Sequence, residues 1–208
     1  MPGAINICGI PDHMLGGVNP LLAVYVFDTF TAADGQALST HAPDIAPALS
    51  SWDVDNASVF DSTGNVEKLA TAAAAPNYAW ISAGVADGIV SATIRLSATA
   101  NSYTGLMVHV ADSANMMEIA MNSFLSELSV TQNVAGTRAA ISTAAITFTA
   151  GSDYVLAVRT VGPTMTVFVD DTLEITITDT DGETNTSWGL FQFDAITDAS
   201  WDNFRVAK

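Results

Sequence analysis

The sequence predicts an all-β protein built as an antiparallel sandwich of two sheets. Apolar and polar residues alternate with a period of two along many short stretches, as expected of strands that bury one face. Gly, Asp and Pro residues that favour turns separate these stretches at short intervals, and no stretch shows the period of a long helix. Many short strands without helices are typical of sandwiches and barrels.

The clearest element is a β-hairpin at residues 165–178. Apolar residues alternate with other residues on both sides of the short turn Asp170-Asp171, which predicts two strands that share a buried face. The apolar positions are Met165, Val167 and Val169 before the turn and Leu173, Ile175 and Ile177 after it.

Similar alternation predicts further strands along the chain. Each is bounded by a turn signal such as Ala86-Asp87-Gly88 or Gly162-Pro163. The stretches are 90–96, 106–110, 117–121 and 154–158.

Residues 1–27 are predicted to form an extended N-terminal arm that precedes the sandwich domain at 28–208. Gly and Pro residues argue against a long helix there, yet the segment is apolar. An apolar, irregular arm should pack on its own domain or clasp a neighbouring subunit, which suits a symmetric homo-oligomer, with a trimer as our specific expectation. The arm residues expected to make the assembly contact are Ile5, Ile7, Ile10, Met14, Leu15, Leu21 and Leu22.

The charge balance limits the partners. The 22 acidic and 6 basic residues give a formal net charge of -16, and no basic cluster occurs. Nucleic acids and anionic membrane surfaces bind proteins through such clusters, so we expect neither as a partner. Cys8 is the only cysteine, which excludes an intrachain disulfide and a Cys-rich zinc site.

Several short motifs follow one another in a fixed order from residue 28 to the end. They are Asp28–Thr31, His41–Asp44, Gly105–Val108, Asp112–Asn115 and Trp201–Val206. In this order they resemble the concanavalin A-like lectin/glucanase superfamily, in particular the laminin-G-like domains of phage and bacterial surface proteins. The resemblance implies a jelly-roll β-sandwich over residues 28–208, with the closing strand beside the opening one. It specifies the fold more than the function, because this fold serves glycanases, lectins, adhesion modules and coat parts alike.

Catalytic chemistry is sought in the carboxylates. A retaining glycanase needs two of them about 5 Å apart. Glucanases of the superfamily carry them as Glu-x-Asp-x-x-Glu on one strand, and this motif is absent here. We therefore expect no catalytic residues and no enzymatic activity. The five scattered glutamates are Glu67, Glu118, Glu127, Glu174 and Glu183.

The sequence does not identify a ligand-binding site clearly. His109 alternates with apolar neighbours and could line a concave face, although a single strand histidine is more often a packing residue. No metal or cofactor site is predicted; calcium in the acidic loops Asp53–Asn56 or Asp179–Gly182 is left open. Sugar binding needs exposed aromatic rings, yet large aromatics in sandwiches are usually core. The candidates are Trp52, Trp80, Trp188, Trp201, Tyr78 and Tyr103.

The first functional hypothesis is a non-enzymatic virion component at the particle surface. It would be a capsid decoration (cement) protein, a head fibre or a tail-associated protein, in contact with itself and with a major capsid protein. The alternative is a glycan-binding adhesion module that recognises a host surface glycan. The third is a polysaccharide hydrolase, which two carboxylates facing one another across a cleft would support.

Overall fold

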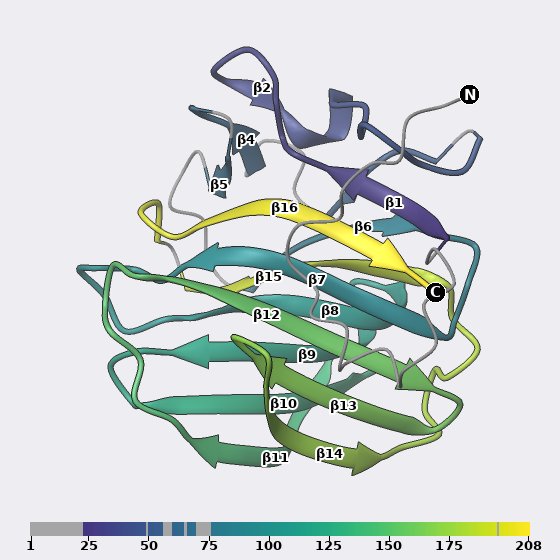
Figure 1. The fold of residues 1–208 in the computed structure, drawn as a ribbon, viewed down its shortest axis with the longest axis vertical. Helices are drawn as coiled ribbons and strands as arrows, with labels where there is room; N and C mark the ends of the chain where they lie inside the picture. Colours follow the sequence, from purple (N-terminus) through teal and green to yellow (C-terminus); the bar gives the residue numbers. More distant parts are fainter. Residues whose placement is uncertain (1–22, 49, 56–59, 65, 70–75, 195) are drawn as a thin grey trace.

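The chain folds as a sandwich of two antiparallel sheets (Figure 1). Strand pairings within the described residues are all antiparallel, and the main apolar core lies between the two sheets. The predicted jelly-roll β-sandwich is confirmed. The computed structural model describes residues 23–48, 50–55, 60–64, 66–69, 76–194 and 196–208.

The first sheet has nine strands. Its hydrogen-bonded order is β14-β13-β12-β7-β16-β5-β4-β2, with β1 paired to β16 on the side of the path. The strands are β1 (Val24–Asp28), β2 (Gln36–Ala37), β4 (Phe60–Ser62), β5 (Glu67–Leu69), β7 (Gly88–Arg95), β12 (Asp153–Val161), β13 (Thr164–Val169), β14 (Thr172–Thr178) and β16 (Ser200–Ala207).

The second sheet has seven strands in the order β11-β10-β9-β8-β15-β6-β3. Among the described residues the only helix is a short 3₁₀ helix at Leu38–Thr40. No helix of the described residues is long and apolar enough to cross a membrane. The strands are β3 (Asp53–Val54), β6 (Asn77–Ser82), β8 (Tyr103–Asp112), β9 (Asn115–Asn122), β10 (Glu127–Val134), β11 (Thr137–Ala145) and β15 (Ser187–Phe193).

The hairpin predicted at 165–178 is present as β13 and β14. Asp170 and Asp171 have φ values of 44° and 67°, which is the two-residue turn geometry that matches the twist of the strands. The placement of Leu173 on the buried face is wrong. A bulge lets Phe168 pair with Leu173 while Val167 pairs with Ile175, so the alternation shifts by one residue and Leu173 is 56% exposed.

The other predicted strands bury the expected faces, except that a bulge at His109 moves Val110 from the core side to the outer face of its sheet. Val90 and Ile94 of β7 and Ile119 of β9 are fully buried in the core between the sheets. The closing strand β16 pairs with the opening strand β1, with Phe204 opposite Asp28, as the resemblance implied.

A buried carboxylate ties the opening strand to the segments that follow it. The Asp28 side chain is fully buried and accepts hydrogen bonds from the Phe30 amide (2.7 Å), His41 Nε2 (2.8 Å) and Trp52 Nε1 (2.8 Å). Hydrogen bonds of this kind compensate the cost of burying a polar group. The motif residues Asp28 and His41 therefore hold the fold together.

The N-terminal arm cannot be compared with its prediction. Ile5, Ile7, Ile10, Met14, Leu15, Leu21 and Leu22 lie outside the described residues. Residues 24–27 of the arm segment belong to β1, so the 27/28 boundary falls inside a strand.

Glu67 of β5 is a second buried carboxyl group in the nine-stranded sheet. Its side chain accepts a hydrogen bond from Ser62 Oγ at 3.1 Å, and its Oε1 atom has no partner. Burial raises the pKa of Glu67 to about 9, against the Ser62 hydrogen bond, which lowers it. The carboxyl group is therefore protonated at neutral pH.

Replacing Glu67 by Gln should flatten the pH dependence of stability. Below about pH 4.5 the Glu67 carboxyl is protonated in both the folded and the unfolded chain, and its contribution to stability is fully present. This contribution is lost as the pH rises towards 9, because the carboxyl of the unfolded chain releases its proton first. The free energy of unfolding should fall by about 1 kcal/mol per pH unit in this window, and the Glu67→Gln variant should lack this component. Urea denaturation from pH 5 to 9 measures it, with Glu174→Gln as control; equal slopes for all three chains would contradict the assignment.

Candidate functional site

The outer face of the seven-stranded sheet carries a second apolar cluster. On β9, Met117, Ile119 and Met121 point into the main core, so Glu118 and Ala120 point outward. The outward side chains gather from four neighbouring strands, β6, β15, β8 and β9, and several remain partly exposed. The cluster consists of Tyr78, Met107, Val110, Met116, Ala120 and Phe191, with Trp80, Tyr103 and Phe193 packed against it.

A row of small residues hollows this face. Phe191 of β15 pairs with Gly105 of β8, Gly105 pairs with Ala120 of β9, and Ala120 pairs with Ser129 of β10. A side chain at Gly105 would place its Cβ 1.9 Å from the carbonyl oxygen of Ile119, so no larger residue fits there. The result is a pocket of about 230 Å³ above the row. Its lining is Tyr103, Glu118, Ala120, Glu127, Ser129, Thr131, Arg138, Ala140, Phe191 and Phe193.

One wall of the pocket is a buried ion pair between Glu118 and Arg138. The Glu118 side chain is 1% exposed. Its Oε2 atom accepts hydrogen bonds from Arg138 Nε at 2.9 Å and from Arg138 Nη2 at 2.5 Å. Its other oxygen accepts a hydrogen bond from Tyr78 Oη at 2.8 Å. Burial, together with the Glu118 charge and hydrogen bond, raises the pKa of the Tyr78 hydroxyl. Glu118 is thus held in place by a cation and a neutral hydroxyl.

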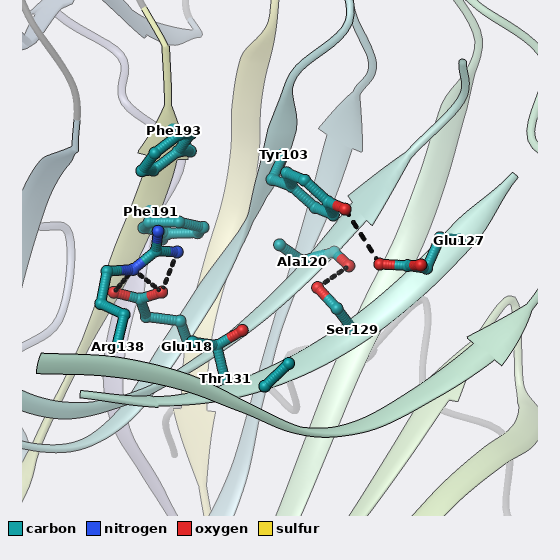
Figure 2. A pocket seen from close by; sticks show the side chains of 10 residues that line it. Tyr103, Glu118, Ala120, Glu127, Ser129, Thr131, Arg138, Phe191 and Phe193 are labelled. Atoms are coloured by element: carbon teal, nitrogen blue, oxygen red, sulfur yellow. Dashed lines mark hydrogen bonds and ion pairs between the residues drawn. The ribbon is translucent and has the colours of Figure 1, made fainter. Parts of the chain in front are cut away.

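The same arginine shows that the face is concave. The Arg138 guanidinium carbon lies 4.4 Å from the centroid of the Phe193 ring and 5.5 Å from that of Phe191. Arg138 is on the edge strand β11 and both rings are on β15, four strands away, which is about 19 Å on a flat sheet. An arginine side chain cannot span that distance, so the sheet curls and brings its edge strand over the pocket (Figure 2).

The opposite side of the pocket is formed by Tyr103 and Glu127. Tyr103 Oη donates a hydrogen bond to Glu127 Oε1 at 2.9 Å, and Figure 2 shows this bond across the pocket from the Glu118–Arg138 pair. Burial, followed by the Glu127 hydrogen bond and charge, raises the pKa of Tyr103, so the tyrosine is a neutral donor. Both partners are partly exposed and accessible to a ligand.

His109 lies away from this pocket. It occupies a bulge of β8 with φ of 55°, and it lines a second cavity of about 310 Å³ beneath the loop that contains Gly182 and Asn185. Its ring centroid is 6.3 Å from that of the buried Trp188. Burial lowers the pKa of His109, so the imidazole is neutral at neutral pH.

The acidic loops considered for calcium have other contacts. Asp179 and Asp181 both accept hydrogen bonds from the Gln132 side chain, at 3.3 and 2.5 Å. Asp53 belongs to β3, and Asn56 lies outside the described residues. Within the described ranges no group of three or more His, Cys, Asp or Glu side chains is arranged to hold a metal ion.

Comparison with known proteins places the fold. No protein-family profile matches the sequence. No curated protein sequence matches it either. Solved structures do match. One is a carbohydrate-binding module from Bacillus subtilis, which is 16% identical with a TM-score of 0.58. The match covers 76% of this chain and 91% of that chain. The chain has a lectin/glucanase-like jelly-roll fold.

Two hydrolases share this jelly roll over most of their length. The Bacillus licheniformis β-glucanase is 11% identical, with a TM-score of 0.57, over 86% of this chain and 99% of that chain. The laminarinase from Rhodothermus marinus is 13% identical, with a TM-score of 0.58, over 91% of this chain and 99% of that chain. At such identities the likeness concerns the fold.

These hydrolases overturn the expectation that the chain is not an enzyme. That expectation rested on the missing one-strand motif, but the jelly roll is shared with laminarinases and β-glucanases. The pocket also brings together Glu118 of β9 and Glu127 of β10, two carboxylates from different strands. A motif search along one strand cannot find such a pair, because only the β9–β10 pairing places the two residues on one face.

The sequence predicted only part of this site. Of the six candidate aromatics, Tyr103 lines the pocket and Tyr78 supports it, Trp80 lies on the same face, and Trp52, Trp188 and Trp201 are core. Arg138, Phe191 and Phe193 were missed. One signal was available: Glu118 interrupts an apolar strand as its single charged residue.

Removing Arg138 should destabilise the protein. Arg138→Met leaves the Glu118 carboxylate buried without its cation, at an expected cost of about 3 kcal/mol in the free energy of unfolding. Adding Glu118→Gln should recover part of that loss, because the neutral amide needs no cation. Urea denaturation measures both variants, and Arg159→Met, an exposed arginine of β12, is the matched control. An Arg138→Met variant as stable as the control would contradict the role of the ion pair.

Proposed function

We propose that the chain is a carbohydrate-binding jelly-roll protein whose ligand occupies the pocket on the concave face of the seven-stranded sheet. The observation that carries the proposal is the combination of aromatic rings and hydrogen-bonding groups in that pocket. Tyr103 offers a partly exposed ring on which the apolar face of a sugar could stack, and Phe193, one face of which Arg138 covers, adds apolar surface. Glu127, Ser129 and Thr131 add hydrogen-bonding groups for hydroxyls.

The wider context agrees with this proposal. Solved proteins with the same jelly roll include a carbohydrate-binding module and enzymes named for glucans and laminarin. The Glu118–Arg138 pair gives the pocket a rigid wall, so little side-chain freedom would be lost on binding.

Replacing Phe193 by Ala should weaken glycan binding. A central aromatic anchor typically contributes about 1–2 kcal/mol, so the affinity should fall about tenfold or more. Titration calorimetry against soluble neutral, amino and acidic oligosaccharides measures it. Phe124→Ala is the control, because Phe124 is half-exposed at the β9–β10 turn and does not line the pocket. The proposal fails if no glycan of the panel binds, and the site is wrong if Phe124→Ala and Phe193→Ala behave alike.

A second candidate function is glycoside hydrolysis, favoured by the two carboxylates of the pocket. In the strand register Glu127 lies opposite Asn122, four residues from Glu118, or about 13 Å along the strand. This offset exceeds the carboxylate separation of about 5 Å in retaining hydrolases and also that of about 6.5–9.5 Å in inverting ones, so an inverting mechanism would require the two side chains to lean toward one another. Glu127, with its neutral Tyr103 donor, is the group free to exchange a proton with substrate.

If the chain is a hydrolase, Glu127→Gln should abolish turnover and preserve the fold. The expected loss is about a hundredfold or more, since general acid–base groups contribute on that scale. Release of reducing ends from each bound glycan measures turnover, and thermal unfolding checks the fold. The Glu174→Gln variant, with the same change on β14, should keep full turnover. Turnover that survives Glu127→Gln would remove this residue from the mechanism.

The virion role rests on the sequence resemblance, the missing glucanase motif and the apolar N-terminal arm. A location at the particle surface, a homotrimer, contacts with a major capsid protein and a role for the N-terminal arm stay predictions. A glycan-binding pocket is compatible with them, because a surface protein of a particle could use it for attachment to a host glycan.

A further inference from the structure

Basic residues are divided unequally between the two sheets. All six of them lie in the described part of the chain, and five belong to the nine-stranded sheet or directly follow it. Arg138 is therefore the single basic residue of the seven-stranded sheet. The five others are Lys68 in β5, Arg95 in β7, Arg159 in β12, Arg205 in β16 and Lys208 after β16.

The positive charge of Arg138 is already neutralised. Its guanidinium makes a two-atom contact with Glu118 and stacks over the rings of Phe191 and Phe193. Glu127, the second carboxylate of the pocket, accepts a hydrogen bond from Tyr103 and forms no ion pair with any of the six basic side chains. The pocket thus holds one uncompensated negative charge.

The overall charge of the chain has the same sign. The chain has a formal net charge of -16. The Glu127 carboxylate and the acidic chain as a whole would repel uronate or sulfate groups. A protonated amine would instead gain an ion pair with Glu127.

We propose that the preferred ligand is a glycan with free, protonated amino groups, such as an oligomer of amino sugars that lack N-acetyl groups. This rests on the proposed function, and it names the ligand class of the same pocket. The amine would bind the Glu127 carboxylate while the sugar ring stacks on Tyr103 or Phe193. The hydroxyls of Ser129 and Thr131 lie along the same strand for the remaining polar groups.

A matched pair of ligands tests the proposal on the full chain. β-1,4-linked glucosamine tetramers, with and without N-acetyl groups, share one backbone and differ in charge. At about pH 5.5 the amines are protonated while an ordinary carboxyl is ionised. The free-amine tetramer should bind about tenfold tighter by calorimetry at low salt, which corresponds to about 1.4 kcal/mol. This advantage should shrink as salt is added, because salt screens charges at accessible sites.

Two variants assign the effect to the pocket. Glu127→Gln should remove the preference, because it weakens binding of the free-amine tetramer about tenfold more than binding of the N-acetylated one. Glu174→Gln makes the same change in charge on β14 of the other sheet and should leave the preference intact. A preference that persists in Glu127→Gln, or is lost equally in both variants, would overturn the role of the pocket carboxylate.

The failures can be told apart. If the N-acetylated tetramer binds as tightly as the free-amine tetramer or tighter, the amino-glycan preference is wrong and the carbohydrate site stands. If neither tetramer nor any other glycan binds, the proposed function itself fails. If a tetralysine peptide binds as tightly as the free-amine tetramer, the pocket recognises cations in general and the glycan assignment is overturned.

Discussion

The architecture of the candidate site depends on the need to neutralise one buried carboxylate. Glu118 points outward from a central strand, yet it is 1% exposed, and an unpaired charge at such a position would cost several kcal/mol. The single cation on that sheet, Arg138, is on the edge strand two positions away. The ion pair bridges strands about 10 Å apart, and the curl of the sheet places the same arginine over Phe191 and Phe193, four strands away. Arg138 therefore neutralises Glu118 and covers the two rings with one side chain.

The alternation of apolar and polar residues predicted the strands well, because a strand that buries one face must alternate in this way. The β13–β14 hairpin and the inward face of β9 follow directly from period two. Leu173 shows the limit: a bulge at Glu174 shifts the parity of the strand, and a bulge depends on the partner strand as well as on the local sequence. The sequence could not predict the site either, because the site also depends on how neighbouring strands pair. Glu118, Glu127 and Arg138 lie on three strands whose register the sequence does not display.

The residues that carry the family resemblance serve mainly to hold the fold. Asp28 accepts three hydrogen bonds in the interior, and one donor is His41 of the second motif. Gly105 of the middle motif is required by close backbone contact with Ile119. Such constraints are shared by proteins that bind or cleave different ligands. This explains why motifs that specify the jelly roll correctly do not specify what occupies its concave face.

What distinguishes this jelly roll is the origin of its charges. A one-strand glucanase motif places its carboxylates through alternation alone, whereas here two neighbouring strands contribute one carboxylate each. One of them, Glu118, is committed to Arg138, and the other, Glu127, keeps its charge at the accessible side of the pocket. With the five other Lys and Arg residues in or directly after the other sheet, no Lys or Arg side chain of the described residues is placed to cancel that charge. In the proposed complex the protonated amine of the glycan supplies the compensating cation, and this connects the fold to the proposed ligand class.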